Sequence, residues 1–234
     1  MSRGVGAVES IQGLLPEWLA LVVALLTQLG DVWFLTLLLA VLYWLDAPRR
    51  DAIAVVVGAW IAGTGMYLGL KEVFALPRPN EPLADPSLYP SVIQPVYEAT
   101  ALATGYGFPS GHAVGTTIVY VGLAAVFTSS TRRRRFTGAA ALVGTVCFSR
   151  VALGVHYLVD VVAGVAAGLL LLLVVRALAA RRPDDPAATT FGLAVVFAVF
   201  FVVVSGVAFK SILVLAASLG TVAGWRFFDF GRRG

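Results

Sequence analysis

Apolar segments long enough to form membrane helices recur along most of this 234-residue chain. Only 13% of its residues are charged, whereas a soluble domain carries about a quarter. Uncharged stretches of this length are typical of membrane-spanning helices. We therefore predict an all-α, polytopic membrane helix bundle with about six to seven transmembrane helices. The clearer spans are 31–46, 52–73, 111–128, 136–152 and 157–180.

Two apolar regions are less regular than these spans. Residues 14–29 are short for a span, and we expect an interfacial helix there, with the first half of a broken span as the alternative. The block at about 190–228 is too long for one helix and is interrupted around Lys210, which predicts a helical hairpin. The whole chain, 1–234, is expected to form one domain with its core at 31–180 and this hairpin at its end.

The basic residues indicate an orientation. The formal charge is +4, and most arginines lie in short clusters between the apolar segments. With the spans assigned above, the clusters fall on one side, which the positive-inside rule makes cytoplasmic. This placement fits a multi-pass protein of the cell membrane and argues against a nucleic-acid partner. The clusters are Arg49–Arg50, Arg132–Arg135, Arg181–Arg182 and Arg226 with Arg232 and Arg233.

The opposite, non-cytoplasmic side holds a smaller set of cations. Apart from Arg3 and Arg176, Arg78 and Arg150 are the only arginines outside the clusters, and Lys71 ends the second span. Three cations that converge without matching carboxylates repel one another unless an anion completes the group. Arginine binds phosphate oxygens in a planar, bidentate way, and lysine adds a point charge. The alternative for each is an anchor at the membrane interface.

A second group opens the third span at Pro109-Ser110-Gly111-His112. Ser110 is suited to cap a helix, and Gly111 lets a ligand approach the backbone. The free N–H groups of a helix N-terminus favour an anion. The alternative is an ordinary helix start with an incidental histidine.

A third group combines Arg150 with His156 and Asp160. Four positions separate His156 from Asp160, which places them on one face of a helix. A carboxylate so placed holds an imidazole in one tautomer, as a histidine nucleophile needs, whereas no carboxylate is near His112 in sequence, which suits an acid. The alternative is a structural His–Asp pair that ties two helices. Two histidines and one aspartate make a poor metal site, so we expect no metal and no cofactor.

Together the three groups predict a site for metal-independent phosphoryl transfer. In chain order they read Lys71-x6-Arg78-Pro79, then Pro109-Ser110-Gly111-His112, then Ser149-Arg150-x5-His156-x3-Asp160. This order and spacing resembles the three-part signature of the type 2 phosphatidic acid phosphatase (PAP2) superfamily, which also includes vanadium haloperoxidases. The resemblance covers residues 71–160 directly.

The resemblance implies a division of roles. His156 would attack phosphorus and form a phosphohistidine, Asp160 would orient it, and His112 would protonate the leaving oxygen. The phosphate would be held by Lys71, Arg78, Ser110, Gly111 and Arg150. The expected partner is a lipid phosphate, of the phosphatidate or polyprenyl diphosphate type, in the membrane, and the oligomeric state is left open. The alternatives are a lipid phosphotransferase, a haloperoxidase, or a non-catalytic lipid-phosphate binding or transport protein.

One further expectation concerns the long connection at about 74–110. It is rich in proline, and loops of this length are often functional. Within it, the loop at 80–108 is expected to line or cover the entrance of the site, with membrane-interface anchoring as the alternative for each of its aromatic residues. They are Tyr89, Tyr97, Tyr106 and Phe108.

Overall fold

The computed structural model describes residues 4–79 and 81–233, with side chains as far as Phe227. Within these residues every regular element is a helix, which confirms the all-α prediction. Arg3 and the side chains of Arg232 and Arg233 lie outside the described part. The N-terminal half contains α1 (Ala7–Gln12), α2 (Leu19–Thr27), η1 (Gln28–Gly30), α3 (Val32–Leu45), η2 (Ala47–Arg49), α4 (Arg50–Phe74), η3 (Pro86–Leu88) and α5 (Gln94–Ala101).

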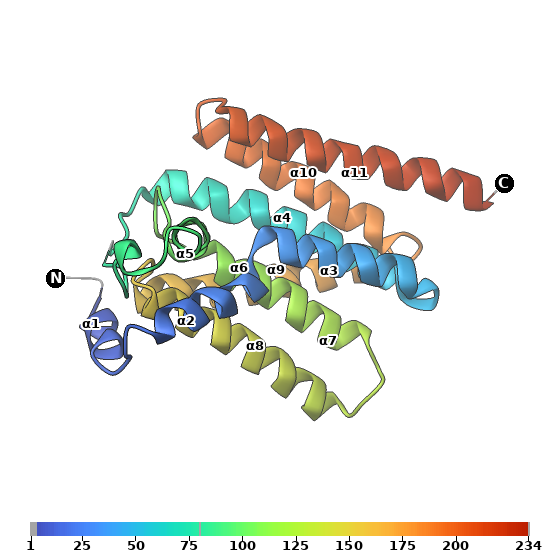
Figure 1. Cartoon of the computed structure of the whole chain (residues 1–234). Helices are drawn as coiled ribbons and strands as arrows, with labels where there is room; N and C mark the ends of the chain where they lie inside the picture. The colour runs from blue at the N-terminus through green and yellow to red at the C-terminus, as the bar shows by residue number, and fades with distance from the viewer. Residues whose placement is uncertain (1–3, 80, 234) are drawn as a thin grey trace.

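The second half of the chain is also helical. The helix that begins at Gly111 runs through three consecutive segments without a break, and the middle segment is π-helical. The elements are α6 (Gly111–Thr116), η4 (Thr117–Val121), α7 (Gly122–Val126), α8 (Arg132–Ala152), α9 (Leu158–Arg181), α10 (Pro186–Val204) and α11 (Phe209–Arg233). The predicted C-terminal hairpin is present as α10 and α11, which run side by side (Figure 1).

Fewer helices than predicted meet a strict test for membrane spans. Among the described residues, three helices are long and apolar enough: Ala47–Phe74, Leu158–Arg181 and Pro186–Val204. A fourth arises if the pair Leu19–Gly30 and Val32–Leu45, bent by 47°, counts as one span. This pair corresponds to the broken-span alternative for residues 14–29. The structure therefore supports three to four spans by this test, and six to seven stays a prediction.

Local sequence explains where several helices begin. Asp185 caps α10 by accepting a hydrogen bond from the N–H of Ala188 (3.0 Å), and Pro186 occupies the first helical position, where its missing N–H costs nothing. Thr131 caps α8 in the same way, through the N–H of Arg134 (3.4 Å). These caps fix the positions at which the polar connections give way to apolar helices.

Small residues allow α4 and α10 to pack closely. A Cβ atom added at Gly65 would lie 2.8 Å from the backbone carbon of Phe197, and one at Gly58 would lie 2.4 Å from Oγ1 of Thr190. Close backbone approach at glycine is the usual way in which membrane helices associate. Because α4 carries Lys71 at its far end, this packing fixes the direction in which Lys71 enters the site.

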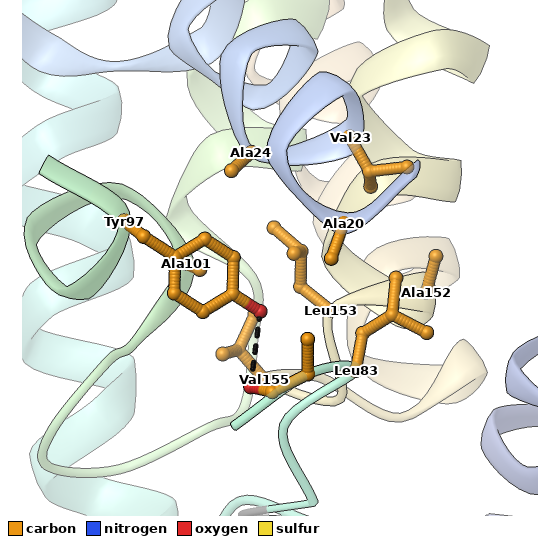
Figure 2. Packing of buried hydrophobic residues seen from close by; sticks show 10 residues of the cluster. Ala20, Val23, Ala24, Leu83, Tyr97, Ala101, Ala152, Leu153 and Val155 are labelled. Carbon is orange, nitrogen blue, oxygen red and sulfur yellow. Dashed lines mark hydrogen bonds between the residues drawn. The ribbon is translucent and has the colours of Figure 1, made fainter. Parts of the chain in front are cut away.

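A cluster of buried apolar residues supports the segment around His156. Figure 2 shows Ala20 and Ala24 of α2 facing Tyr97 and Ala101 of α5, with Leu153 between them. The hydroxyl of Tyr97 donates to the carbonyl of Ala84 (3.3 Å), which ties the long connection into the cluster. The turn that leads from α8 to His156 is therefore held by packing against α2 and α5.

The arginine clusters and the candidate site lie at opposite ends of the bundle. In Figure 1 the connections α3–α4, α7–α8 and α9–α10 lie at the right, and α5 with the start of α6 lies toward the left. The first three connections carry the arginine clusters at Arg49–Arg50, Arg132–Arg135 and Arg181–Arg182. This separation agrees with the arrangement that the sequence predicts.

Candidate active site

Six of the eight predicted site residues line one cavity of about 390 Å³. They come from α4, the connection after it, the start of α6, the end of α8 and the turn before α9. Ser110 and Asp160 are fully buried and lie behind this lining. The six are Lys71, Arg78, Gly111, His112, Arg150 and His156. The structure thus brings the three sequence groups together, as their spacing predicts.

His156 and Asp160 form a pair, although not on one helical face. His156 lies in the turn before α9, and Asp160 is in the first turn of that helix. The carboxylate Oδ2 accepts the backbone N–H of Tyr157 (3.0 Å) and lies 3.4 Å from Nδ1 of His156. The expectation of a shared helical face was wrong because the helix begins only at Leu158. The aspartate is fixed instead by the backbone N–H of Tyr157, the residue that caps the helix.

The partners of His156 define its tautomer. Its Nε2 atom lies 3.0 Å from Nη1 of Arg78, and a guanidinium can only donate. Nε2 must therefore accept, which places the ring proton on Nδ1, toward Asp160. The result is a neutral imidazole whose unprotonated nitrogen faces the arginine and the cavity.

Burial favours the same neutral form. Only 2% of His156 is exposed, and its burial lowers the pKa well below the usual value of 6.5. The cations Arg150, Arg78 and Lys71 lower this pKa further, and His112 contributes least. A neutral histidine is the form that acts as a nucleophile.

Two of the cations are oriented by backbone carbonyls. Arg78 donates through Nη1 to Val155 (2.8 Å) and through Nε to Gly105 (3.1 Å). Lys71 donates to the carbonyls of Tyr106 (2.5 Å) and Gly107 (3.3 Å). Carbonyls orient the two cations without neutralising their charge. The site is therefore electropositive and suited to an anion.

Arg150 is the most buried of the cations. It is 4% exposed and donates through Nη1 to Oγ1 of Thr27 on α2 (3.2 Å), while its Nε atom has no hydrogen-bond partner. An unsatisfied buried donor is costly, and a phosphate oxygen would satisfy it. Thr27 was not identified from the sequence, since an isolated threonine in an apolar helix carries no signal.

The start of α6 is tied to the start of α9. Ser110 caps α6 by accepting from the N–H of Ala113 (3.5 Å), and its own N–H donates to the carbonyl of Asp160 (3.0 Å). A Cβ atom at Gly111 would lie 2.6 Å from the ring of Tyr67, so only glycine fits there. Two helix N-termini therefore meet at the cavity, and both favour a bound anion.

The cavity also contains acidic and basic residues that sequence reasoning did not place there. Asp31 lies 3.8 Å from His112, measured from Oδ2 to Nε2, and Glu72 and Lys210 line the same cavity. A carboxylate between two apolar segments of a membrane protein is a sequence signal for a functional residue, and Asp31 lies in such a position. Its partner is distant in the sequence, so the contact could not be predicted.

The aromatic residues of the long connection divide into two groups. Tyr106 lines the cavity, as expected. Tyr97 is fully buried and Tyr89 packs on it, with ring centroids 4.7 Å apart, while Phe108 packs edge-on against Phe74. Tyr97 is part of the core of Figure 2 and Tyr89 packs against that core, whereas Thr104, Gly105 and Tyr106 of the loop at 80–108 line the cavity, as expected of that loop.

Among the described residues, no group of three or more His, Cys, Asp or Glu side chains could hold a metal ion. His112 and Asp31 form one acid–base pair, and His156 and Asp160 form another. The polar groups that face the cavity are chiefly cationic donors. The arrangement can thus bind a tetrahedral anion, attack it from Nε2 of His156, and supply a proton from His112.

Comparisons with known proteins agree with this geometry. The PAP2 superfamily profile matches residues 51–184, more than half of the chain. Lipid phosphate phosphatase delta of Arabidopsis thaliana is 34% identical over 119 residues, covering 44% of this chain and 26% of that protein. Lipid A 4'-phosphatase of Porphyromonas gingivalis is 38% identical over 88 residues, covering 36% and 35%. The chain thus matches about a quarter to a third of the length of these relatives.

Two solved structures share the fold. The PAP2 type phosphatidylglycerolphosphate phosphatase from Bacillus subtilis superposes with a TM-score of 0.61 at 24% identity, over 76% of this chain and 84% of that one. LpxE of Aquifex aeolicus gives a TM-score of 0.55 at 19% identity, over 74% and 94%. With the profile match over the helices that build the site, these comparisons show that the chain is a membrane protein that belongs to the PAP2 superfamily.

Proposed function

We propose that this chain hydrolyses a phosphate ester or anhydride of a lipid-like substrate, without a metal, through a phosphohistidine at His156. The orientation of His156 is the observation that carries the proposal. Its unprotonated Nε2 lies 3.0 Å from Arg78, a residue suited to bind the oxygens of a phosphate. A nucleophile and a phosphate ligand are thus adjacent before any substrate enters.

In the first step, the lone pair of Nε2 forms a bond to phosphorus. The bond between phosphorus and the leaving oxygen breaks, and His112 gives a proton to that oxygen. The imidazole of His156 becomes positively charged, and Asp160, 3.4 Å from Nδ1, stabilises this charge. Lys71, Arg78 and Arg150 neutralise the oxygens of the transferred phosphoryl group, helped by Ser110 and the N–H of Gly111.

In the second step, water attacks the phosphohistidine. His112, now neutral, takes a proton from the water as the new bond between oxygen and phosphorus forms. The bond from phosphorus to Nε2 breaks, and inorganic phosphate leaves with His156 neutral again. One histidine thus serves as acid and then as base, and no other proton carrier is required.

The substrate class follows from where the site lies. It is at the bundle end opposite the arginine clusters (Figure 1), which supports our proposal that it faces the non-cytoplasmic side of a multi-pass protein of the cell membrane. A head group at the membrane surface reaches such a site while its tail stays in the lipid. The relatives are named for lipid phosphates and lipid A. Phosphatidate-type lipids, phosphatidylglycerol phosphate, polyprenyl diphosphates and sphingoid phosphates are the candidates.

Phosphate release by the purified protein in detergent tests the proposal. The assay uses a panel of lipid mono- and diphosphates with excess EDTA. We expect release to continue in EDTA and to fall by roughly 10³-fold or more in His156→Ala. His156→Gln, which keeps a polar side chain of similar size, separates loss of the nucleophile from loss of packing.

Three outcomes contradict parts of the proposal. Substantial turnover by both His156 variants contradicts the phosphohistidine. Loss of turnover in EDTA contradicts metal independence. Tight binding of lipid phosphates without release of phosphate from any of them indicates a non-catalytic binding protein.

A further inference from the structure

The break between η1 and α3 lies against His112. A Cβ atom added at Gly30 would lie 2.6 Å from Cγ1 of Val146 and 3.2 Å from Cδ2 of His112. The backbone at this break is therefore in close contact with the histidine ring. The segment lies outside residues 51–184, the part that matches the family profile.

The next residue, Asp31, places a carboxylate beside His112. One oxygen, Oδ1, caps α3 by accepting the N–H of Trp33 (3.4 Å). The other, Oδ2, lies 3.8 Å from Nε2 of His112, and both residues line the cavity. This distance is too long for a hydrogen bond, so the carboxylate acts on the ring through its charge.

The surroundings of His112 make this charge important. Its Nε2 atom is buried and has no hydrogen-bond partner. The other charged or titratable groups at the cavity are Lys71, Arg78, Arg150, His156, Glu72, Lys210, Tyr67 and Tyr106. The cations among them oppose a positive charge on His112, whereas an acid catalyst must carry that charge.

We propose that Asp31 is a positioning residue that favours the protonated form of His112 against the neighbouring cations and orients it for transfer of its proton to the leaving oxygen. This inference rests on the proposed function. The carboxylate stabilises the imidazolium before the phosphorus–oxygen bond breaks, and again after His112 has taken a proton from water.

Asp31→Asn tests the charge alone. Asparagine caps helices as well as aspartate does, so α3 keeps its start. The substitution removes only the negative charge. An opposite charge at this separation shifts the titration of its neighbour by roughly one unit. In a plot of kcat against pH, activity should fall at high pH as His112 loses its proton, and we call this fall the alkaline limb. We therefore expect Asp31→Asn to move the alkaline limb to lower pH by about one unit.

The leaving group gives a second readout. An alkyl phosphate leaves as a strong base and needs the proton, whereas p-nitrophenyl phosphate needs it little. We expect Asp31→Asn to lower kcat by about tenfold for the alkyl substrate at pH above the limb, and by less than twofold for the aryl one. In a His112→Ala background, Asp31→Asn should have no further effect.

Asp85→Asn is the matched control, because Asp85 also caps a short helix on this side of the bundle but does not line the cavity. It should leave both readouts unchanged. Equal losses with both substrates, or an unmoved alkaline limb, would overturn the role of Asp31.

A measurement without turnover separates this inference from the proposed function. The chain has two histidines, so NMR titration of the tag-free protein in detergent gives two ring signals, assigned with the His112→Ala and His156→Ala variants. We expect Asp31→Asn to move the midpoint of His112 to lower pH by about one unit and to leave His156 nearly unmoved. A shifted midpoint in a protein that hydrolyses nothing supports the charge pairing and contradicts the proposed function. An unshifted midpoint in an active protein overturns the inference alone.

Discussion

Nε2 of His156 lies 3.0 Å from Nη1 of Arg78, and the same guanidinium nitrogen donates to the carbonyl of Val155. Arg78 therefore binds the residue before the proposed nucleophile and faces the nucleophile itself. A phosphate that enters the cavity meets a donor and a lone pair on adjacent groups. This relationship links the position of the phosphate to the position of the attacking atom.

Arg78→Lys should lose most of the activity although the charge is kept. A lysine ammonium cannot donate in parallel to Gly105, Val155 and a phosphate, because its three donors share one atom. We expect kcat/KM to fall by roughly 10²-fold, since misplacement near a reacting centre has costs of that size. Arg49→Lys, at the opposite end of the bundle, is the control. Wild-type kinetics in Arg78→Lys would show that the separate donor atoms of the Arg78 guanidinium are not needed for activity.

The lowered pKa of His156 predicts the acid limb of the activity profile. Nε2 must be unprotonated to attack, so activity is lost as pH falls through the pKa of the folded protein. Because burial and neighbouring cations lower that pKa, the limb should lie below pH 6.5. We expect kcat/KM to stay level from pH 7.5 to 6.5 in a pH series. A limb centred above pH 6.5 would contradict a buried, neutral nucleophile.

The same shift predicts how stability depends on pH. The unfolded chain has a histidine pKa of about 6.5, so between the lowered folded value and 6.5 it binds more protons than the folded chain. Stability therefore rises with pH across this window and falls as the solution is acidified. Thermal unfolding in detergent between pH 5 and 7 measures this slope. The slope should be smaller in His156→Gln, which has no imidazole to protonate.

Sequence reasoning predicted the cavity because its motif residues lie at the ends of apolar segments. Lys71, Gly111 and Arg150 each lie near a helix terminus, and chain order alone brings those termini to one end of the bundle. The roles assigned to these residues stay predictions until variants are measured.

The remaining features depend on contacts between distant segments. Asp31 meets His112 only because the bend of 47° between η1 and α3 turns the break toward the bundle. Tyr97 is part of the core because α2 and α5 pack together, which its place in a proline-rich connection does not reveal. His156 lies outside α9 because the first turn of that helix begins after it, a boundary that apolar periodicity does not define to one residue.

Gly154→Ala should destabilise the turn that carries His156. Gly154 has a φ of +68°, and an added Cβ atom would lie 1.7 Å from the carbonyl oxygen of Glu81. The side chain therefore brings both backbone strain and a collision with the backbone. We expect a loss of stability of roughly 1–3 kcal/mol or more, with loss of activity. Thermal unfolding and the phosphate-release assay measure the two effects.

Gly138→Ala provides the matched control for that substitution. Gly138 lies inside α8, and nothing lies within 4 Å of an added Cβ atom. Alanine is a better helix former than glycine by about 1 kcal/mol, so this variant should be as stable as the wild type or more so. Equal stability of the Gly154→Ala and Gly138→Ala variants would mean that the turn before His156 is not constrained as the structure indicates.

Asp160→Asn should remove the negative charge beside His156 while leaving the helix start in place. One carboxylate oxygen, Oδ2, accepts the N–H of Tyr157 at 3.0 Å and also lies 3.4 Å from Nδ1 of His156, so an amide oxygen in that position keeps both contacts. The neutral amide no longer stabilises the positive imidazole that forms when Nε2 attacks phosphorus. We expect kcat to fall by roughly 10²- to 10⁴-fold with little change in the temperature of unfolding. The phosphate-release assay and thermal unfolding in detergent measure the two effects. Full activity in this variant would mean that the charge of Asp160 does not assist the nucleophile.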